Sequence, residues 1–553
     1  MTLFTASAQF DAWFAEAVGR PTPIQHQAWP PLREGRHALL IAGTGQGKSL
    51  AAWRPVAERL VDRPEAVRGV RALHIAPLKA LARDMLNNLA PLLDATGELR
   101  GRPVRRELRC GDTPAADRRA QARRPPEVLS TTPETLFVLL GSPSGRRMLE
   151  TVDTVVVDEV HALAPGRRGA HLALSLARLD ALCRREIHRI GLSATAEPVA
   201  ALARWLGGEA PVDVIAPDAT RDRSPRLLVE RPGPALGAYA GTALWDAIHD
   251  RLAALAGRDG GLLVFCQTRA QVERTAFALG ERLGPERVGA HHGSLDSVCR
   301  TDAEARFREG RLDVLVGSAS LELGLDLGTI DRVAQLGSPG GLNALRQRAG
   351  RSRHRPGQQS VLHWFPLTRH QLLEVEAVED ALRACAMDHL SASPGYRDVL
   401  AQQLVAMVAA DGVDSVELAL ERIRRARPWR SLTCESLTTI VDVLVEAGAG
   451  LPAAQRTAWL VREHDERLVV PPGARRRVLA NAGTIPEWFE YTVVDVGGGE
   501  TVGRLDEEFA FESSPGQVIQ LGHRAFRILR VRCGQVDVEP ADDEAAAELP
   551  FWF

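Results

Sequence analysis

The sequence predicts an α/β protein with two parallel-sheet halves in tandem, followed by a helical segment and a small all-β domain. Apolar runs at residues 37–41 and 154–157, and again at 262–266, have the near-continuous hydrophobicity of strands buried on both faces. Helical periodicity follows residue 370, and residues 491–538 alternate between apolar and polar with glycine turns. At ~100–200 residues per domain, the 553 residues suggest roughly three to five domains.

A glycine-rich loop follows the first apolar run. Its sequence is A-G-T-G-Q-G-K-S, and such loops wrap phosphates with backbone N–H groups at a helix N-terminus. The ammonium of Lys48, one of only two lysines in 553 residues, is placed to reach the β- and γ-phosphates, and the Ser49 hydroxyl to ligate Mg²⁺. The alternative is a chance glycine-rich turn. The pattern predicts a site for ATP and Mg²⁺ formed by Gly43, Thr44, Gly45, Gln46, Gly47, Lys48 and Ser49.

Two adjacent carboxylates follow the second apolar run. Asp158 and Glu159 begin the tetrapeptide D-E-V-H. A parallel sheet delivers residues that follow its strands to its carboxyl edge, where the phosphate loop also lies. We expect Asp158 to hold Mg²⁺ and Glu159 to orient and deprotonate the attacking water. Acidic pairs are usually solvated surface, so this assignment depends on the preceding strand and on Lys48.

Four further segments of the first half complete a pattern: T-P-I-Q at 22–25, A-P-L-K-A-L-A-R-D at 76–84, G-D-T at 111–113 and T-T-P-E at 131–134. With these segments the chain resembles the superfamily 2 helicases. The resemblance implies that the Gln25 amide pairs with the adenine edge. It also implies contacts to the nucleic-acid backbone, which carry no sequence information, from Lys79, Arg83, Gly111, Asp112, Thr132, Pro133 and Glu134.

The second half contains segments similar in order and spacing to the later motifs of that family, at 267–269, 291–294, 318–326 and 347–355. The resemblance assigns Arg351 to the γ-phosphate, a role worth about 10³–10⁵ in rate in phosphoryl transfer. It places His354 in the same catalytic group, where many relatives carry a further arginine. A solvated basic cluster is the alternative. The remaining implied contacts are to nucleotide, from Asp326 and Arg348, and to the strand, from Arg269, His292 and Ser318.

The pentapeptide at 350–354 narrows the resemblance. G-R-S-R-H is similar to the G-R-A-G-H of Lhr-type (large helicase-related) proteins, with Arg353 in place of a glycine. Downstream, segments 399–407 and 427–432 resemble the winged-helix domain of that family, and 481–486, 503–509 and 550–552 resemble its β-barrel. The resemblance implies two RecA-like domains at residues 1–220 and 221–370, a winged-helix domain at 371–456 and a small β-barrel domain at 457–553. A plain helical spacer is the alternative for the third domain.

The implied function is that of an ATP-dependent 3′→5′ translocase on single-stranded DNA. Such an enzyme would unwind 3′-tailed DNA or RNA–DNA duplexes, with DNA repair as its setting. Lhr-type cores continue beyond the barrel, so a protein partner that supplies that region is a further expectation. Two alternatives stay open: an RNA-directed helicase, and a nucleotide-gated clamp or scaffold in a larger, possibly defence-related complex.

Composition limits these possibilities only weakly. Hydrophobic content of 45% with 25% charged residues is ordinary for globular chains, and no apolar stretch approaches the ~20 residues that span a bilayer, so we expect a cytoplasmic protein. A net charge of −2 gives no bulk attraction for a polyanion, and any nucleic-acid surface must be local. Seven scattered cysteines without a C-x-x-C pair indicate neither a zinc ribbon nor an iron–sulfur cluster.

Overall fold

The computed structural model of the chain describes residues 3–43, 45–61, 68–183, 185–194, 197–217, 224–256, 260–322, 327–328, 330–352, 359–384, 386–389, 395–446, 458–484, 490–506, 509–510, 513–522, 524–532, 534–541 and 550. The chain divides into two compact units, each made of two separate stretches. Met1–Arg221 with His389–Pro486 form the first unit, and Asp222–Asp388 with Glu487–Phe553 form the second. Among the described residues, no helix is both long and apolar enough to cross a membrane.

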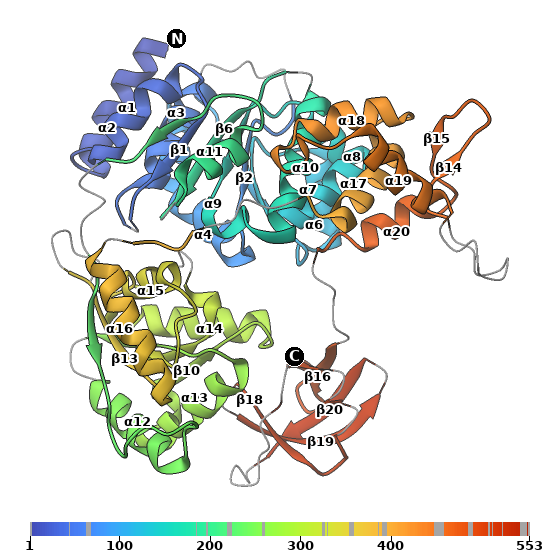
Figure 1. The fold of residues 1–553 in the computed structure, drawn as a ribbon. Coiled ribbons are helices and arrows are strands. Elements are labelled where there is room, and N and C mark those ends of the chain that lie inside the picture. The colour runs from blue at the N-terminus through green and yellow to red at the C-terminus, as the bar shows by residue number, and fades with distance from the viewer. Residues whose placement is uncertain are drawn as a thin grey trace. The chain divides into compact units, whose positions relative to one another are not determined.

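The first unit is built on a seven-stranded sheet in the order β3-β4-β2-β5-β6-β1-β7 (Figure 1). All of its neighbouring strands pair in parallel, which confirms the predicted α/β class. The strands are β1 (Ala38–Ile41), β2 (Ala72–Ile75), β3 (Arg106–Arg109), β4 (Val128–Thr131), β5 (Thr154–Val157), β6 (His188–Ser193) and β7 (Asp213–Ile215).

Both faces of this sheet are buried. Successive side chains of a strand point to opposite faces, and accordingly Leu39 and Val155 belong to one apolar cluster whereas Leu40 and Val156 belong to another. The helices that accompany the sheet are α1 (Leu3–Ala17), α2 (Pro23–Arg33), α3 (Lys48–Val61), α4 (Lys79–Asn88), α5 (Ala90–Leu99), α6 (Ala115–Arg123), α7 (Pro133–Gly141), α8 (Pro143–Leu149), α9 (Val160–Leu163), α10 (Gly166–Cys183) and α11 (Val199–Gly207).

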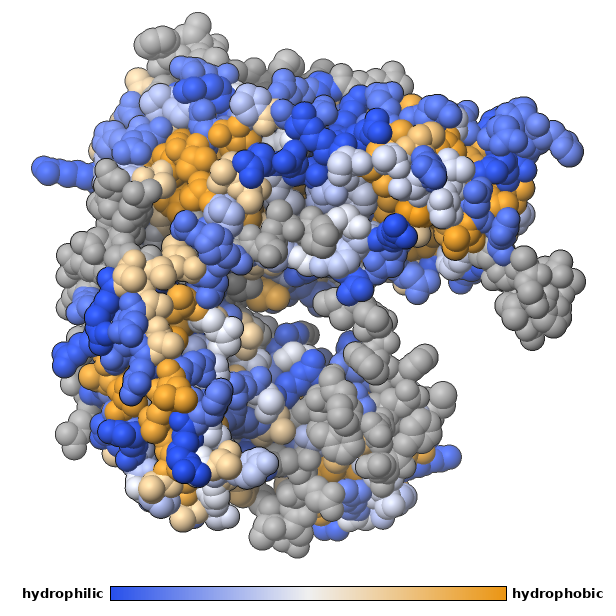
Figure 2. Space-filling model, viewed as in Figure 1, coloured by the Kyte–Doolittle hydropathy of each residue, from blue (hydrophilic) through white to orange (hydrophobic). Residues whose placement is uncertain are grey.

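A helical extension, residues 395–446 and 458–484, belongs to the first unit. It contains α17 (Arg397–Ala410), α18 (Val416–Arg424), the 3-10 turn η4 (Arg427–Trp429), α19 (Cys434–Val445), the antiparallel pair β14 (Val461–Arg462) and β15 (Leu468–Val469), and α20 (Ala474–Ala480). Three helices and a short hairpin are the elements of a winged helix. The hairpin and α20 lie within 457–553, the stretch that the sequence assigned to the β domain, but they pack in this unit. In Figure 2 the surface over α18 and α19 mixes hydrophobic and hydrophilic residues.

The extension packs on α10 through apolar and charged contacts. Leu404 and Met407 of α17 share an apolar cluster with Leu172 and Leu176 of α10. Arg178 of α10 is 1% exposed. Its Nε and Nη2 donate to the two carboxylate oxygens of Asp411, at 2.6 and 3.2 Å, and Nη1 donates to Gln403 Oε1 at 3.0 Å.

Asp411 also binds Arg146 of α8, so one carboxylate at the end of α17 joins α8 and α10 to the extension. Buried carboxylates are costly to desolvate unless several donors surround them. The three donors around Asp411 therefore hold the extension against α8 and α10.

The second unit contains a six-stranded parallel sheet in the order β10-β11-β9-β12-β13-β8, as predicted for the second half. Its strands are β8 (Arg226–Val229), β9 (Gly261–Phe265), β10 (Val288–His291), β11 (Val314–Gly317), β12 (Ile330–Leu336) and β13 (Val361–Phe365). They alternate with α12 (Thr242–Leu255), α13 (Arg269–Leu283), η2 (Pro285–Arg287), α14 (Ser297–Arg308), η3 (Ala319–Leu321), α15 (Leu342–Ala349) and α16 (Arg369–Arg383).

A five-stranded sheet at the C-terminal end completes this unit, in the order β17-β16-β20-β19-β18. Gly503 of one edge strand lies against Leu521 of the other edge strand, which shows that the sheet is curled. Phe526 and Val538 belong to the same apolar cluster as Val264 and Val288 of the six-stranded sheet. The strands are β16 (Glu490–Asp495), β17 (Glu500–Asp506), β18 (Val518–Leu521), β19 (Arg524–Arg532) and β20 (Gln535–Pro540). The predicted small β domain is present in this curled form.

Replacing Asp411 by alanine should destabilise the first unit by about 3–5 kcal/mol, because it leaves the buried Arg178 guanidinium without its carboxylate. The free energy of unfolding in urea measures the effect. Asp398→Ala is the matched control, since the Arg167–Asp398 pair joins the same two helices with both side chains more than half exposed. Its loss should lower stability by less than about 1 kcal/mol. Equal losses in the two variants would contradict the role given to Asp411.

Candidate nucleotide and nucleic-acid site

The phosphate loop lies between the end of β1 and the start of α3. Gly45 and Gly47 have φ angles of 77° and 85°, which glycine adopts without steric cost. Lys48 is the first residue of α3, and its Nζ donates to the carbonyl oxygens of Ala42 at 2.6 Å and Gly43 at 3.0 Å. The helix N-terminus and the ammonium thus lie together at this loop, as the sequence predicted, with Ser49 in the first turn; Thr44 is outside the described residues.

Gln25 is bound to this loop, although 22 residues separate it from Gly47. Its side chain is 1% exposed, and its Nε2 donates to the Gly47 carbonyl at 3.1 Å. Its Oε1 accepts from the Thr22 N–H at 2.8 Å, and the Thr22 hydroxyl donates to the Gln46 carbonyl at 3.0 Å. A Cβ on Gly47 would approach Gln25 Nε2 to 2.4 Å. The structure therefore places Gln25 where it shapes the phosphate loop, a contact that the sequence did not predict.

Asp158 and Glu159 follow β5 at the carboxyl edge of the same sheet. The Asp158 N–H continues the strand pairing by donating to Ile75 at 2.9 Å, and Asp158 Oδ1 accepts from the Glu159 N–H at 2.9 Å. Glu159 has a φ of 47°, in the left-handed region that non-glycine residues rarely occupy. Its backbone therefore turns sharply into α9, and strain of this kind is concentrated at functional sites.

His161 connects these carboxylates to β6. Its Nδ1 lies 2.8 Å from the Ser193 hydroxyl and 3.6 Å from Glu159 Oε2. The pKa of His161 is lowered to about 4, chiefly by burial and also by the Lys48 ammonium, while Asp158 acts in the opposite direction. A neutral imidazole at physiological pH follows. The Ala42 N–H, at the start of the phosphate loop, donates to the Ser193 carbonyl at 3.2 Å, so the loop and the D-E-V-H turn meet at the same residue of β6.

The strand-contact residues predicted for the first half also follow strands β2, β3 and β4. Lys79 begins α4, and its Nζ donates to Asp112 Oδ1 at 2.7 Å, with both side chains about half exposed. Gly111 lies beside Lys79, and Arg83 is exposed on the next turn of α4. The structure thus gathers four of the predicted residues at one end of α4.

The other three predicted residues form the start of α7. Thr132 is the N-cap, Pro133 is the first helical residue, and Glu134 binds Arg168 of α10 through two bonds of 2.6 and 3.0 Å. Burial opposes ionisation of Glu134, but the Arg168 guanidinium outweighs it and holds the pKa of that carboxyl below its usual value. Arg168 is a partner that no sequence pattern identified.

In the second unit, three predicted residues meet at the carboxyl edge of β9, β10 and β11. Arg269 begins α13, and its Nη1 donates to the Ser294 hydroxyl at 2.6 Å. The Ser318 N–H donates to the His291 carbonyl at 3.3 Å. His292, however, is 0% exposed and faces Glu273 at 2.7 Å, so its side chain holds the loop and is not presented at the surface.

The two predicted arginines of α15 and its end converge on Glu322. Arg348 Nε donates to Glu322 Oε1 at 2.8 Å, and Arg351 Nη2 donates to the Glu322 carbonyl at 2.8 Å. Both arginines are nearly buried, at 6% and 4% exposure. Glu322 lies within the motif-like segment 318–326, but no role was predicted for it. Asp326 and His354 lie outside the described residues.

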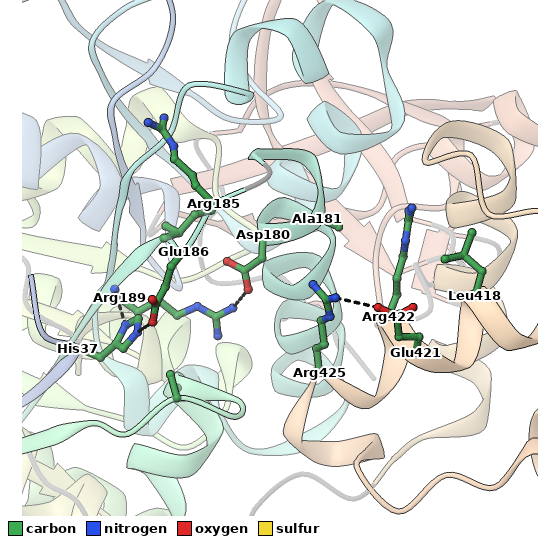
Figure 3. A pocket seen from close by; sticks show the side chains of 13 residues that line it. His37, Asp180, Ala181, Arg185, Glu186, Arg189, Leu418, Glu421, Arg422 and Arg425 are labelled. Atoms are coloured by element: carbon green, nitrogen blue, oxygen red, sulfur yellow. Dashed lines mark hydrogen bonds and ion pairs between the residues drawn. The ribbon is translucent and has the colours of Figure 1, made fainter.

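A cavity of about 420 Å³ lies at the opposite edge of the first sheet, beside the amino ends of β1 and β6 and against α18 (Figure 3). Four arginines and three carboxylates line it. Each carboxylate has a basic partner in the pairs Asp180–Arg189, Glu186–His37 and Glu421–Arg425. The cavity is therefore nearly self-neutralised, and it is separate from the phosphate loop at the carboxyl edge.

Comparison with known families agrees with this geometry. Residues 22–202 match the DEAD/DEAH box helicase model, and residues 244–356 match the helicase conserved C-terminal domain. Residues 380–548 match the winged helix domain of the large helicase-related protein, a model that extends over the helical extension and the C-terminal sheet. The first two matches contain the phosphate loop, the D-E-V-H turn and both arginines that bind Glu322.

Individual relatives match nearly the whole chain. The Lhr helicase/probable uracil glycosylase of Mycolicibacterium smegmatis is 36% identical over 99% of this chain, which spans 39% of that protein. The ATP-dependent helicase Lhr-Core of Methanothermobacter thermautotrophicus is 33% identical over 98% of this chain, which spans 64% of it. The chain thus spans between about two fifths and two thirds of the length of these curated relatives.

Solved structures give the same result. The helicase Lhr of Mycobacterium smegmatis, solved with single-stranded DNA and AMP-PNP, aligns with a TM-score of 0.78 and 34% identity over 94% of this chain and 68% of the other. The DUF1998 helicase MrfA aligns with a TM-score of 0.72 at 19% identity, a likeness of fold alone. Two RecA-like sheets, a winged helix and a curled C-terminal sheet, with these motifs at their edges, show that the chain belongs to the Lhr family of superfamily 2 helicases.

Proposed function

We propose that this chain is a nucleic-acid-stimulated ATPase that moves 3′→5′ along single-stranded DNA and unwinds 3′-tailed DNA or RNA–DNA duplexes, with DNA repair as its setting. One observation carries the ATPase part of the proposal: the loop of Lys48 and the turn of Asp158 and Glu159 lie at one sheet edge, where Ser193 accepts from the loop's Ala42 N–H and its hydroxyl lies 2.8 Å from His161. A water-activating carboxylate beside a phosphate loop is needed for hydrolysis, whereas a clamp that only binds has no need of one.

The chain offers oxygen ligands for Mg²⁺. A serine hydroxyl and a carboxylate suit this hard cation, which keeps several waters and binds through few protein groups. We assign Ser49 and Asp158 to Mg²⁺, Gln25 to the adenine edge, and Lys48 with the loop N–H groups to the phosphates. Bound ATP and Mg²⁺ supply the phosphoryl group and the charge that polarises it. Glu159 then accepts the proton of the attacking water, and its left-handed backbone fixes the direction of its side chain.

The strand is assigned to the residues that follow β2, β3 and β4 in the first unit and β9, β10 and β11 in the second. In each unit an exposed cation and a helix N-terminus lie at that edge: Lys79 on α4 and Arg269 on α13. Both features attract the negative charge of backbone phosphates. If each unit grips the phosphate chain, a cycle of ATP binding and hydrolysis that changes one grip at a time moves the strand in one direction.

Replacing Glu159 by glutamine should preserve ATP binding and strand binding but abolish hydrolysis, because an amide holds water without accepting its proton. The measurements are ATP affinity by nucleotide fluorescence and strand-stimulated phosphate release. Glu186→Gln is the control, since Glu186 is exposed at the opposite end of the sheet and should leave turnover unchanged. Turnover by Glu159→Gln within a few-fold of the parent would remove Glu159 as the base.

Replacing Arg351 by alanine should leave ATP binding nearly intact and lower strand-stimulated turnover by about 10³-fold or more, as for other arginines that meet a γ-phosphate. Arg351→Lys should rescue little, because an ammonium cannot reproduce the planar guanidinium. Arg311→Ala is the control, since Arg311 forms an exposed pair with Glu309. A parental rate in Arg351→Ala would exclude the proposed role.

The direction and substrate can be tested on tailed duplexes. A 3′-tailed DNA duplex should be unwound and a 5′-tailed one should not, because the motor loads on single strand and moves toward the duplex only from the 3′ tail. Strand-separation assays with DNA, RNA–DNA and RNA duplexes of one sequence measure this. Equal ATPase stimulation by RNA and DNA, with unwinding of RNA duplexes, would replace the proposal with the RNA-directed alternative.

A further inference from the structure

In the second unit, a buried carboxylate joins the six-stranded parallel sheet and its helices to the C-terminal sheet. Glu273 of α13 is 0% exposed, and its Oε1 accepts from His292 Nε2 at 2.7 Å and from the Gly522 N–H at 2.8 Å. Since the Ser294 N–H donates to His292 Nδ1 at 3.3 Å, the ring proton lies on Nε2 and points to Glu273. One oxygen atom therefore links the loop after β10 to the turn between β18 and β19.

The same loop pairs with the edge strand of the C-terminal sheet. The Arg504 N–H donates to the Ser294 carbonyl at 2.9 Å, and Leu295 forms an antiparallel bridge with Gly503. The approach is so close that a Cβ on Gly503 would lie 2.8 Å from the Ser294 oxygen and 2.8 Å from the Leu521 side chain. Residues 294–295 thus extend the curled sheet beyond β17.

The C-terminal sheet also contacts Arg269, the cation beside this loop. Arg269, whose side chain is 37% exposed, donates to the Ser294 hydroxyl and lies 3.8 Å from Glu490 of β16. Arg504 of β17 holds the same Glu490 at 3.0 Å. The position of the Arg269 guanidinium is therefore set on one side by the loop and on the other by the sheet.

We propose that the C-terminal sheet holds the strand-contacting loop 291–296 and Arg269 in their binding conformation, and that Glu273 is the positioning residue for this loop. The proposal rests on the proposed function, in which Arg269 and this loop contact strand phosphates. Glu273 itself is buried and acts through His292 and Gly522. Ordering a free loop at the moment of binding weakens affinity, whereas a loop already held by a supporting shell avoids that entropy loss.

Glu273→Ala removes the acceptor for both donors. We expect its affinity for a single-stranded oligonucleotide to fall by about three- to tenfold, equivalent to ~0.7–1.4 kcal/mol. The slope of log affinity against log salt should become shallower by about 0.7 for each phosphate that the variant no longer neutralises. ATP turnover without strand should stay at the parental value. Glu273→Gln keeps an Oε1 acceptor and should therefore bind the oligonucleotide with nearly parental affinity. Such a recovery relative to Glu273→Ala would show that the lost hydrogen bonds, and not a general loosening of the core, weaken binding.

A second variant approaches the loop from the sheet side. Gly503→Ala forces the Ser294 carbonyl to move and should reproduce both the weaker affinity and the shallower salt slope. Gly497→Ala, in the turn between β16 and β17, is the control, because its Cβ would meet only a side-chain atom, at 3.4 Å. Gly503→Ala decides the question if Glu273→Ala fails to fold. Parental affinity and slope in Gly503→Ala would overturn the proposal.

Hydrogen exchange separates this inference from the proposed function. The amides of residues 294–296 and 504 should exchange faster in both variants than in the parent, in the absence of any nucleic acid. A parent that neither binds strand nor shows strand-stimulated ATPase would refute the proposed function, while the exchange rates would still report whether the sheet holds the loop. Unchanged exchange rates in both variants would overturn the proposal that the C-terminal sheet holds the loop, whatever the affinity for single-stranded DNA.

Discussion

The parallel register of β1, β6 and β5 is the constraint on which the candidate nucleotide site depends. Ile41 pairs with Ser193, and Val157 pairs with Gly191, so three strands end at nearly the same level. Residues that follow them must therefore emerge side by side, although more than a hundred positions separate the phosphate loop from the D-E-V-H turn. The strand order places β6 between the other two. This explains why Ser193 is the residue that meets His161.

Two buried carboxylates, Asp411 and Glu273, hold together elements that are far apart in the sequence. Asp411 binds two arginines of the first unit, and Glu273 joins a loop to the C-terminal sheet. The less buried Glu322 binds Arg348 through its carboxylate and Arg351 through its main-chain carbonyl. An isolated buried carboxylate would be strongly destabilising, and multiple donors offset that penalty only when their geometry is right. Such groups therefore fix the relative position of the elements that supply the donors. Apolar contacts alone, which are not directional, specify that position less sharply.

Local patterns were sufficient to predict strands β1, β5 and β9, the phosphate loop and the parallel arrangement of the two sheets. Apolar runs and glycine loops are signals within a few residues, and the parallel sheets that they predicted are present. The pairing partners could not be found in this way. Gln25 contacts Gly47, Arg178 contacts Asp411, and Glu273 contacts Gly522, over separations of 22, 233 and 249 residues. Periodicity indicates that a face is buried but does not identify the residue against it.

His292 shows that even a motif does not identify which of its side chains will be buried. Its position in H-H-G-S predicted a contact with the strand, and the loop does lie at the carboxyl edge, but the ring is turned into the protein. A motif fixes where the backbone goes, whereas burial decides which side chains remain available. Here the buried partner, Glu273, is itself held by the C-terminal sheet.

The accessory segments are consequently parts of the motor halves and not appendages to them. The first sheet cannot lose the helical extension without exposing Arg178 and the apolar cluster that α10 shares with α17. The second cannot lose the C-terminal sheet without exposing Leu295, which is 5% exposed and lies in the cluster that the two sheets share. Because each segment belongs to a different unit, removing either one would expose buried side chains of its own unit alone.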